Sequence, residues 1–110
     1  MVDIKSIEYE NNEKKLIINI SDKIQILYKD ILNIIDDQLL FKYLENLFCI
    51  IDDWEKEYIN TKMIGGNNWK LSIAYMNGNK KEYSGKSSYP TNFEAFERLN
   101  QKLINEVQNG

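Results

Sequence analysis

The sequence contains no histidine and only one cysteine, Cys49, among its 110 residues. Histidine is the commonest general base and the commonest metal ligand, so its absence argues against most acid–base and metal-dependent enzymes. A single cysteine excludes an internal disulfide bond, which fits a reducing compartment. We therefore expect no catalytic residues, no metal, no cofactor and a cytoplasmic location.

Arginine is almost absent as well, since Arg98 is the only one and the formal net charge is −3. Proteins of this size that bind nucleic acid usually carry a basic stripe rich in arginine, so a nucleic-acid partner is not expected. Lys80, Lys81 and Lys86 cluster around one turn. Their simplest interpretation is a solvated strand edge that discourages pairing with other strands.

Long apolar runs are also missing. No stretch of about 18 apolar residues could cross a membrane, and Met1–Lys5 lacks the apolar segment of a signal peptide. No membrane association is expected. The length suits a single domain spanning residues 1–110.

The N-terminal half begins with alternating apolar and polar residues over Ile4–Tyr9, a turn signal at Asn11-Asn12, and an apolar run over Leu16–Ile20. This pattern predicts an antiparallel hairpin. Lys23–Tyr28 alternates again and suggests a third strand, although the apolar spacing over residues 23–35 also suits a helix. Strand and helix both stay open for that segment.

A helix is predicted from an N-cap at Asp36 or Asp37 to about Tyr58. Its apolar residues recur at helical spacing and include Leu40, Leu44, Leu47, Ile51, Trp54 and Tyr58. Leu44, Leu47 and Ile51 are expected to be buried. Cys49 lies opposite this stripe on the helical wheel and is expected to be exposed.

The pattern of the C-terminal half predicts a hairpin of two strands followed by a helix. Gly65-Gly66-Asn67-Asn68 interrupts the chain, Trp69–Tyr75 alternates as a half-buried strand, and Asn77-Gly78 is a hairpin turn signal. The return strand stops near Gly85, and Thr91–Glu94 resembles a capping box that opens the last helix. The predicted fold is α+β, in the order β-β-(β)-α-β-β-α. An antiparallel sheet of four to five strands carries two helices on one face.

The residues of types that commonly carry chemistry have simpler structural interpretations here. Asp52 and Asp53 are adjacent on a helix and point about 100° apart, so they do not converge; Asp36-Asp37 is likewise interpreted as solvated. The glycines lack the spacing of phosphate-binding loops. Cys49 has no histidine to activate it. The sequence is not expected to encode an enzyme.

The aromatic corner between the last strand and the last helix offers the best candidate for a binding surface. Tyr83, Lys86, Tyr89 and Pro90 lie close together in the sequence, and tyrosine is enriched at interaction hot spots. We therefore predict that these four residues contact a partner. The competing interpretation is that Tyr89 packs over the start of the helix as a hydrophobic staple.

The run W-x-L-x-I-x-Y-x-N-G, followed by Y-x-G-x-x-x-Y-P-x-N-F, spans Trp69–Phe93. It resembles small uncharacterised α+β proteins of low-GC bacteria and their mobile elements. The resemblance implies an α+β fold and brings no catalytic residues.

The leading hypothesis is a small non-catalytic protein that binds a macromolecular partner, as an immunity protein or a phage-borne inhibitor of host defence. The partner is expected to be a protein, and a homodimer is possible. The alternative is a protein that binds or sequesters a small molecule or nucleotide in an aromatic pocket.

Overall fold

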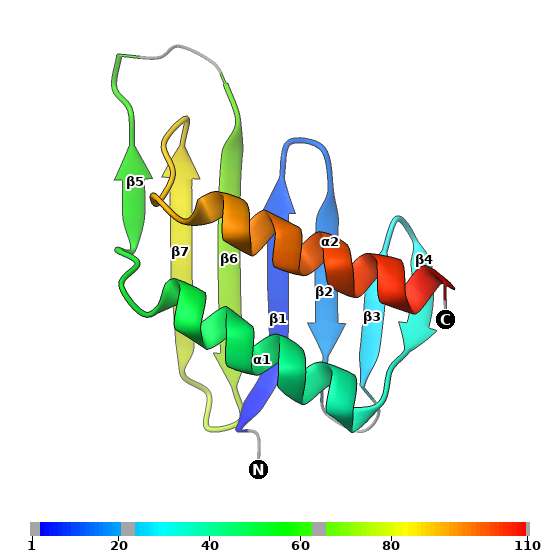
Figure 1. The fold of residues 1–110 in the computed structure, drawn as a ribbon. Helices are drawn as coiled ribbons and strands as arrows, with labels where there is room; N and C mark the ends of the chain where they lie inside the picture. The colour runs from blue at the N-terminus through cyan, green and yellow to red at the C-terminus, as the bar shows by residue number, and fades with distance from the viewer. Residues whose placement is uncertain (1–2, 21–23, 63–65, 110) are drawn as a thin grey trace.

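The computed structural model describes residues 3–20, 24–62 and 66–109. They form an α+β structure in which two helices cover one face of a mixed seven-stranded sheet (Figure 1). The strand order is β4-β3-β2-β1-β6-β7-β5. The elements are β1 (Ile4–Asn11), β2 (Lys15–Asn19), β3 (Gln25–Tyr28), β4 (Ile31–Ile34), α1 (Asp37–Ile51), β5 (Glu57–Ile59), β6 (Asn68–Tyr75), β7 (Lys80–Lys86) and α2 (Phe93–Asn109).

The predicted N-terminal hairpin is confirmed, because β1 and β2 pair antiparallel. The open question over residues 23–35 is resolved in favour of strands. β3 pairs with β2, and β4 pairs with β3 through a tight turn at Lys29 and Asp30. Lys23 lies outside the described residues. Lys29 and Asp30 have φ values of 51° and 62°, which suit the type I′ turn of a two-residue hairpin.

The prediction was therefore wrong in the number of strands and in their directions. Four to five antiparallel strands were expected, whereas the sheet has seven strands and is mixed. The additional strands are β4 and β5. β5 is short and runs parallel to β7, with Glu57 opposite Ser84 and Ile59 opposite Lys86.

Helix α1 begins as predicted, since the Asp36 side chain accepts a hydrogen bond from the Leu39 backbone N–H at 2.8 Å. Leu44, Leu47 and Ile51 are buried, as expected, and Cys49 is exposed.

The predicted end of α1 was wrong, because the helix stops at Ile51 and Tyr58 belongs to β5. After Ile51 the chain turns, and the Trp54 backbone N–H donates to the Ile51 carbonyl at 3.0 Å. This turn allows the Trp54 indole to enter the core and donate to Asn92 Oδ1 at 2.6 Å. The apolar spacing continues past the end of the helix because Trp54 is buried and Tyr58 is partly buried, although neither belongs to α1.

The C-terminal half follows the prediction closely. β6 and β7 form a hairpin, with Gly78 at φ 91° in the Asn77-Gly78 turn. Gly65 lies outside the described residues. Helix α2 begins at Phe93, so Asn92 rather than Thr91 directly precedes it, and the Ala95 backbone N–H donates to the Asn92 carbonyl at 3.1 Å. The predicted capping box was wrong, because the helix starts one residue later than a Thr91 cap requires and the Asn92 side chain bonds Trp54 and Ile50 instead.

The two helices pack side by side over the sheet and share a buried polar contact. Tyr43 of α1 donates a hydrogen bond to Asn100 Oδ1 of α2 at 2.6 Å, and Asn100 is only 1% exposed. Buried polar side chains need partners, so this bond favours one placement of α1 against α2. Among the described residues, neither helix combines the length and apolar character that crossing a bilayer requires.

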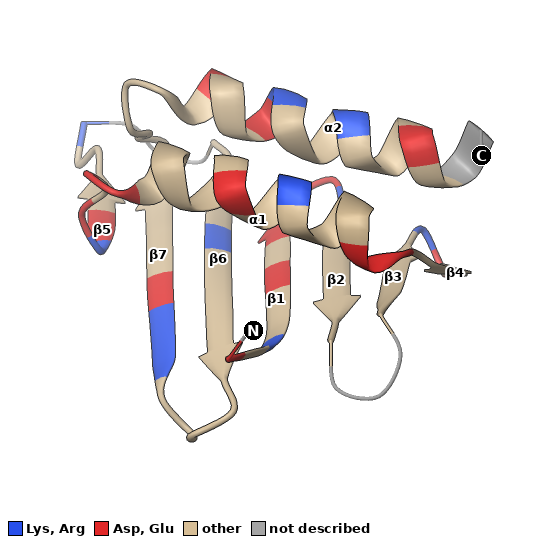
Figure 2. Cartoon of the chain, turned by 60° about the horizontal axis from the view of Figure 1, so that its bottom comes forward, with Lys and Arg blue, Asp and Glu red and all other residues tan. Residues whose placement is uncertain are grey.

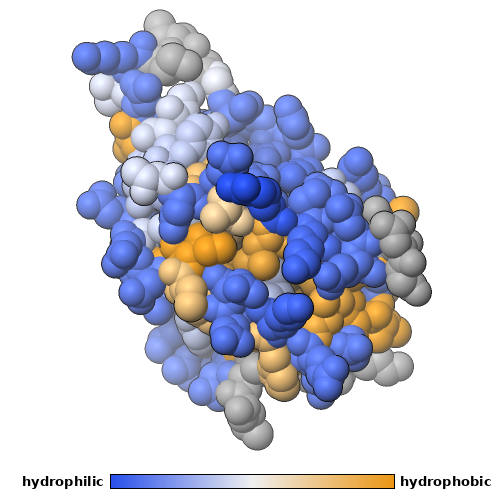
Figure 3. All heavy atoms as spheres, in the orientation of Figure 1, coloured by the Kyte–Doolittle hydropathy of each residue, from blue (hydrophilic) through white to orange (hydrophobic). Residues whose placement is uncertain are grey.

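The uncovered face of the sheet has two unlike halves. Charged residues lie along β1, β6 and β7, whereas β3 and β4 contain none (Figure 2). In the β2–β4 half, Ile17 lies opposite Leu27 and Leu27 lies opposite Leu32, which gives an apolar row. Seen from the helix side, hydrophobic spheres gather over the end of the sheet that carries β4 (Figure 3).

Candidate functional site

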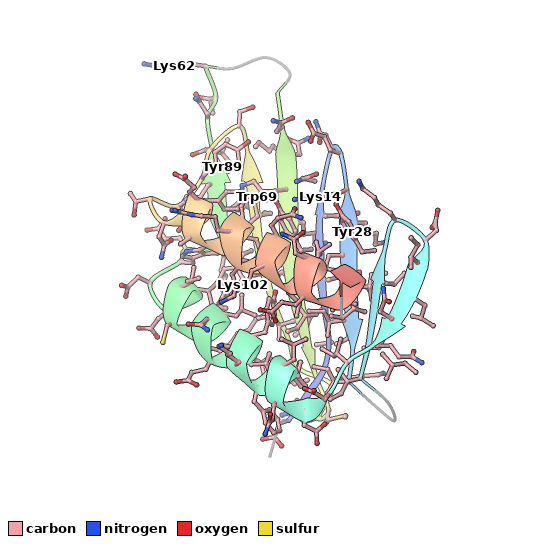
Figure 4. All side chains as sticks on the ribbon, turned by 45° about the vertical axis from the view of Figure 1, so that its right-hand side comes forward. Lys14, Tyr28, Lys62, Trp69, Tyr89 and Lys102 are labelled. Atoms are coloured by element: carbon pink, nitrogen blue, oxygen red, sulfur yellow. The ribbon has the colours of Figure 1, made fainter. Side chains whose placement is uncertain are left out.

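The aromatic residues predicted to form a corner assemble into a cluster between the sheet and the start of α2. Its centre is Trp54, whose ring lies 5.5 Å from Trp69, 5.8 Å from Tyr83 and 5.3 Å from Phe96. Trp69 and Tyr89 lie together near the start of α2 (Figure 4), with ring centroids 6.5 Å apart. Aromatic pairs at such distances stabilise a core beyond their buried area.

Hydrogen bonds fix both indoles of this cluster. Trp54 donates to the Asn92 side chain, and Trp69 donates to the Ser88 carbonyl at 2.9 Å. Asn92 also donates from Nδ2 to the Ile50 carbonyl at 2.8 Å, which links the start of α2 to the end of α1. Gly85 leaves room for this arrangement, because a Cβ there would overlap Trp69 Nε1 and the Ser88 carbonyl oxygen.

The predicted contact residues do not share one surface. Tyr89 is 42% exposed and packs on Phe93 at 4.8 Å, as the staple interpretation expects. Pro90 is buried and Tyr83 is partly buried. Lys86 follows Gly85, which pairs with the buried Trp69. Because side chains alternate along a strand, Lys86 points to the uncovered face, where it lines a separate hollow with Ile59 and Asn60.

Tyr83 does line a larger hollow, which we call the β7 hollow. It has a volume of about 480 Å³. Its walls are formed by Trp54, Lys56, Lys80, Lys81, Glu82 and Tyr83. It therefore combines an aromatic floor with three lysines, on a chain whose net charge is negative.

Half of β7 is also a free sheet edge beside this hollow. β5 pairs with β7 only over Ser84–Lys86. On that side Ser84 N–H donates to the Lys56 carbonyl at 2.9 Å, and the Lys86 carbonyl accepts from Asn60. Backbone groups alternate in direction along a strand. Lys80 and Glu82 therefore direct their N–H and C=O groups towards the same side as Ser84 and Lys86, away from β6. Within the described part of the chain, no strand lies beside them.

The one carboxylate that lines the β7 hollow, Glu82, is paired with a lysine that lies outside the hollow. Lys70 Nζ lies 2.8 Å from Glu82 Oε2. The hydrogen bond from Lys70, followed by its positive charge, lowers the pKa of Glu82, so this carboxyl stays ionised and paired. Among the residues that line the hollow, three lysines therefore accompany one paired carboxylate.

A second polar cluster joins β1 to α2. The Tyr9 hydroxyl donates to the Glu97 carboxylate, and Lys14 Nζ lies 3.2 Å from Glu97 Oε2. Burial, and then the hydrogen bond to Glu97, raises the pKa of Tyr9 well above its usual value near 10. A phenol in this state stays protonated and is poorly suited to act as a base or nucleophile, so the cluster has a structural role.

The other candidate groups do not converge. Asp52 and Asp53 are both exposed, and Asp36 caps α1. The described residues contain no group of three or more Cys, Asp or Glu side chains placed to hold a metal ion.

Sequence reasoning missed part of the β7 hollow. The sequence analysis assigned Trp54 to the apolar stripe of a helix. No sequence pattern indicated a role for Lys56, because its position depends on where α1 ends. Lys80 and Lys81 were recognised as edge lysines. Their common hollow with Trp54 could have been found only by ending the helix at the Asp52-Asp53 pair.

Comparisons of the chain with protein-family models, curated proteins and solved structures find no match.

Proposed function

We propose that this protein acts without catalysis by binding an acidic, extended segment of a partner protein along the free half of β7. The observation that carries the proposal is the β7 hollow, where an unpaired strand edge lies among three lysines and two aromatic side chains. Extended peptides commonly bind by adding a strand to such an edge, with backbone hydrogen bonds giving affinity and side-chain pockets giving specificity.

The charge of the edge supports an acidic partner. Lysines on an edge strand discourage pairing with neutral or basic strands. When such a segment pairs with β7, carboxylates at alternate positions would lie on the uncovered face, beside Lys80. Its apolar side chains would lie on the helix-covered face, beside Trp54 and Tyr83. The edge therefore selects its partner by charge.

An immunity-type or phage-borne anti-defence inhibitor remains our proposal for the biological role. Such proteins work by occupying a surface of their target, and the resemblance over Trp69–Phe93 favours this class. Lys86 and Tyr89 stay predicted contact residues. Both lie outside the β7 hollow, so they would contact other parts of the same partner.

A direct test uses an eight-residue peptide of alternating glutamate and valine, titrated by calorimetry at low salt. We expect binding that weakens as salt rises, because exposed charges are screened. Replacing Lys80 and Lys81 by glutamate should weaken binding at least about tenfold, which corresponds to about 1.4 kcal/mol. The matched control reverses Lys42 and Lys102, which line a different groove between the helices. Equal loss in both variants would contradict a site at β7.

The natural partner can be sought with the same variants. Immobilised wild-type protein and the Lys42/Lys102 control should retain the same protein from a lysate of the source cells, and the Lys80/Lys81 variant should not. Recovery of that protein by all three would place the contact elsewhere. Turnover of any bound molecule would refute the absence of catalysis.

The same hollow also favours the second candidate, an anionic small molecule such as a nucleotide. Its volume of about 480 Å³ lies in the range of small-molecule pockets. A ligand that binds only the folded state raises the melting temperature. A thermal shift with one nucleotide, lost on reversal of Lys80 and Lys81, would favour this candidate over the peptide.

A further inference from the structure

A second hollow lies beside α1, on the flank of this helix that faces away from α2. We call it the α1 hollow, and its volume is about 340 Å³. Its apolar walls are formed by Ile4, Phe41, Leu44, Phe48 and Tyr75. The two charged residues that line it, Asp3 and Glu45, are both acidic. Phe41 is 50% exposed, whereas the other three phenylalanines of the chain are partly or fully buried.

Strands form the floor of the α1 hollow, and the helix forms one wall. β1 and β6 continue past α1, where Ile4 lies opposite Tyr75 (Figure 1). Phe41 and Phe48 stand on the wall two helical turns apart, which is about 10.5 Å along the axis. Within the described parts of the chain, both helices lie to one side of this floor, so the hollow is open on the other side (Figure 1). Such an open apolar groove has the shape that receives a helix lying beside α1.

The charged residues on this flank of α1 are all carboxylates. At about 100° of rotation per residue, the flank spans an arc of about 80°. It comprises Asp37, Phe41, Glu45, Phe48 and Asp52. All three of its carboxylates are exposed. Apolar and acidic side chains therefore alternate along one line of the helix.

The acidic charge of this flank is not balanced within the part of the chain that the structure describes. The ion pairs found there join Lys14, Lys70 and Arg98 to carboxylates elsewhere in the molecule. Lys81 approaches the α1 hollow, with its Nζ 6.0 Å from the centre of the Tyr75 ring. The three carboxylates of the flank, together with Asp3, outnumber this lysine.

The end of α1 adds to the negative potential. The last carbonyl groups of a helix carry a partial charge equivalent to roughly −0.5 of an elementary charge, so a cation there is stabilising. The last turn of α1 contains no basic residue, and Asp52 and Asp53 follow it. A cation supplied by a partner would relieve this repulsion.

We propose that the α1 hollow binds an amphipathic helix of a partner protein, with an apolar stripe flanked by lysine or arginine. This helix would lie beside α1 as a third helix on the same face of the sheet. Its apolar side chains at positions i, i+3 or i+4, and i+7 would pack on Phe41 and Phe48. Its basic side chains would reach Asp37, Glu45 and Asp52, which are spread over about 22 Å of α1.

The same charges argue against the other occupants of an apolar groove. An anionic membrane surface attracts basic segments and would repel these carboxylates. A second copy in an isologous contact would bring two acidic flanks together. The proposal does not depend on what binds at the β7 hollow, where the lysines favour the opposite charge.

Fluorescence anisotropy with a labelled helical peptide tests the proposal. The probe is about 18 residues long, or about 27 Å as a helix, with leucine along one face and lysine elsewhere. We expect a Kd in the micromolar range, from about 1 μM to about 100 μM, and weaker binding as salt rises. A peptide with the same leucines but glutamate in place of lysine should not bind. Equal binding of both peptides, or no binding of the lysine peptide at about 1 mM protein, would overturn the proposal.

Variants of the flank test the site. Phe41→Ser, and separately Glu45→Lys combined with Asp52→Lys, should each weaken binding of the lysine peptide at least about tenfold. The matched control reverses Glu13 and Glu106, which are exposed and lie outside the α1 hollow. It changes the net charge by the same amount and should bind as wild type does. Equal loss in the two charge-reversed proteins, or undiminished binding by Phe41→Ser, would contradict the proposed site.

Amide chemical shifts measured by NMR locate the peptide on the protein independently of the variants. Adding the lysine peptide should shift residues of the α1 hollow, such as Ile4, Phe48 and Tyr75. Shifts confined to β3 and β4, or to the β7 hollow, would place the helix elsewhere and overturn the proposal. Self-association of the protein alone that Phe41→Ser abolishes would also overturn it, because a second copy would then occupy the hollow.

Discussion

At one edge of the sheet, β4 ends the ladder with four uncharged residues. At the other, the short β5 carries Glu57, and the exposed half of β7 carries Lys80, Lys81 and Glu82. The second edge repels most strands and the first repels none. One sheet thus has an uncharged edge and a charged edge.

The interior behind the two edges differs as well. The β7 end is held by the aromatic cluster, whose indoles are hydrogen-bonded to the segment that starts α2. The β4 end is packed largely through aliphatic side chains such as Ile26 and Ile35. Directional bonds hold the first end in one geometry. The second end depends mainly on apolar burial, which is not directional.

The largest effect that separates the two ends should come from Gly85→Ala. The new Cβ overlaps Trp69 Nε1 and the Ser88 carbonyl oxygen, and a backbone atom cannot move aside cheaply. We expect a loss of about 2–3 kcal/mol in the free energy of unfolding, typical of overpacking. Urea unfolding measures this loss.

The control for that change is Gly78→Ala, where no atom lies within 4 Å but φ is +91°. Its cost should come from backbone conformation alone, about 1 kcal/mol. A Gly85→Ala protein more stable than Gly78→Ala would mean that the aromatic end is packed more loosely than described.

Alkaline pH should weaken the middle of the molecule, between the two ends. Burial raises the pKa of both Tyr9 and Tyr43 above the ordinary value near 10. Their stabilising contribution is therefore complete below pH 10 and is lost as pH rises towards the folded-state pKa. Each tyrosine should contribute a slope of up to about 1.4 kcal/mol per pH unit in that range.

Urea unfolding at pH 8 to pH 11, in wild type and in Tyr43→Phe, separates this contribution from that of the lysines. The variant should lose less stability above pH 10, because Tyr43 is buried and phenylalanine has no proton to release. Parallel curves for the two proteins would show that Tyr43 ionises as easily when folded as when unfolded.

The smallest expected effect concerns the turn that leads into β4. Asp30 has a φ of 62°, which is unfavourable for a residue with a side chain. Asp30→Gly should stabilise the protein by about 0.5–1 kcal/mol, and Asp30→Ala, which keeps the strain, should not. A gain in both variants would point to the loss of the Asp30 charge rather than to relief of the backbone.

The sequence predicted the fold class well where several local signals agreed. The Asn77-Gly78 turn, the alternation over Trp69–Tyr75 and the stripe of α1 all appear in the structure. β4 was missed because its hairpin turns at Lys29-Asp30, a pair without glycine or asparagine. Its short apolar run was also compatible with a helix, and only pairing with β3 decides between the two.

The candidate site was less predictable because it depends on where strands end. Tyr83 and Lys86 are three positions apart on one strand, so a surface containing both was already unfavourable under alternation. The contribution of Lys56 depends on β5, whose three residues pair in parallel with a distant strand. No local pattern specifies such a pairing.

Both tryptophans of the chain, Trp54 and Trp69, lie in contact at the β7 end. Intrinsic fluorescence excited at the indole band therefore reports on one end of the molecule only. A spectroscopic unfolding curve from emission follows the aromatic cluster, while circular dichroism of the peptide bond follows all seven strands and both helices. If the β4 end opens first, the two optical signals will separate, and the emission signal will be the later one to change.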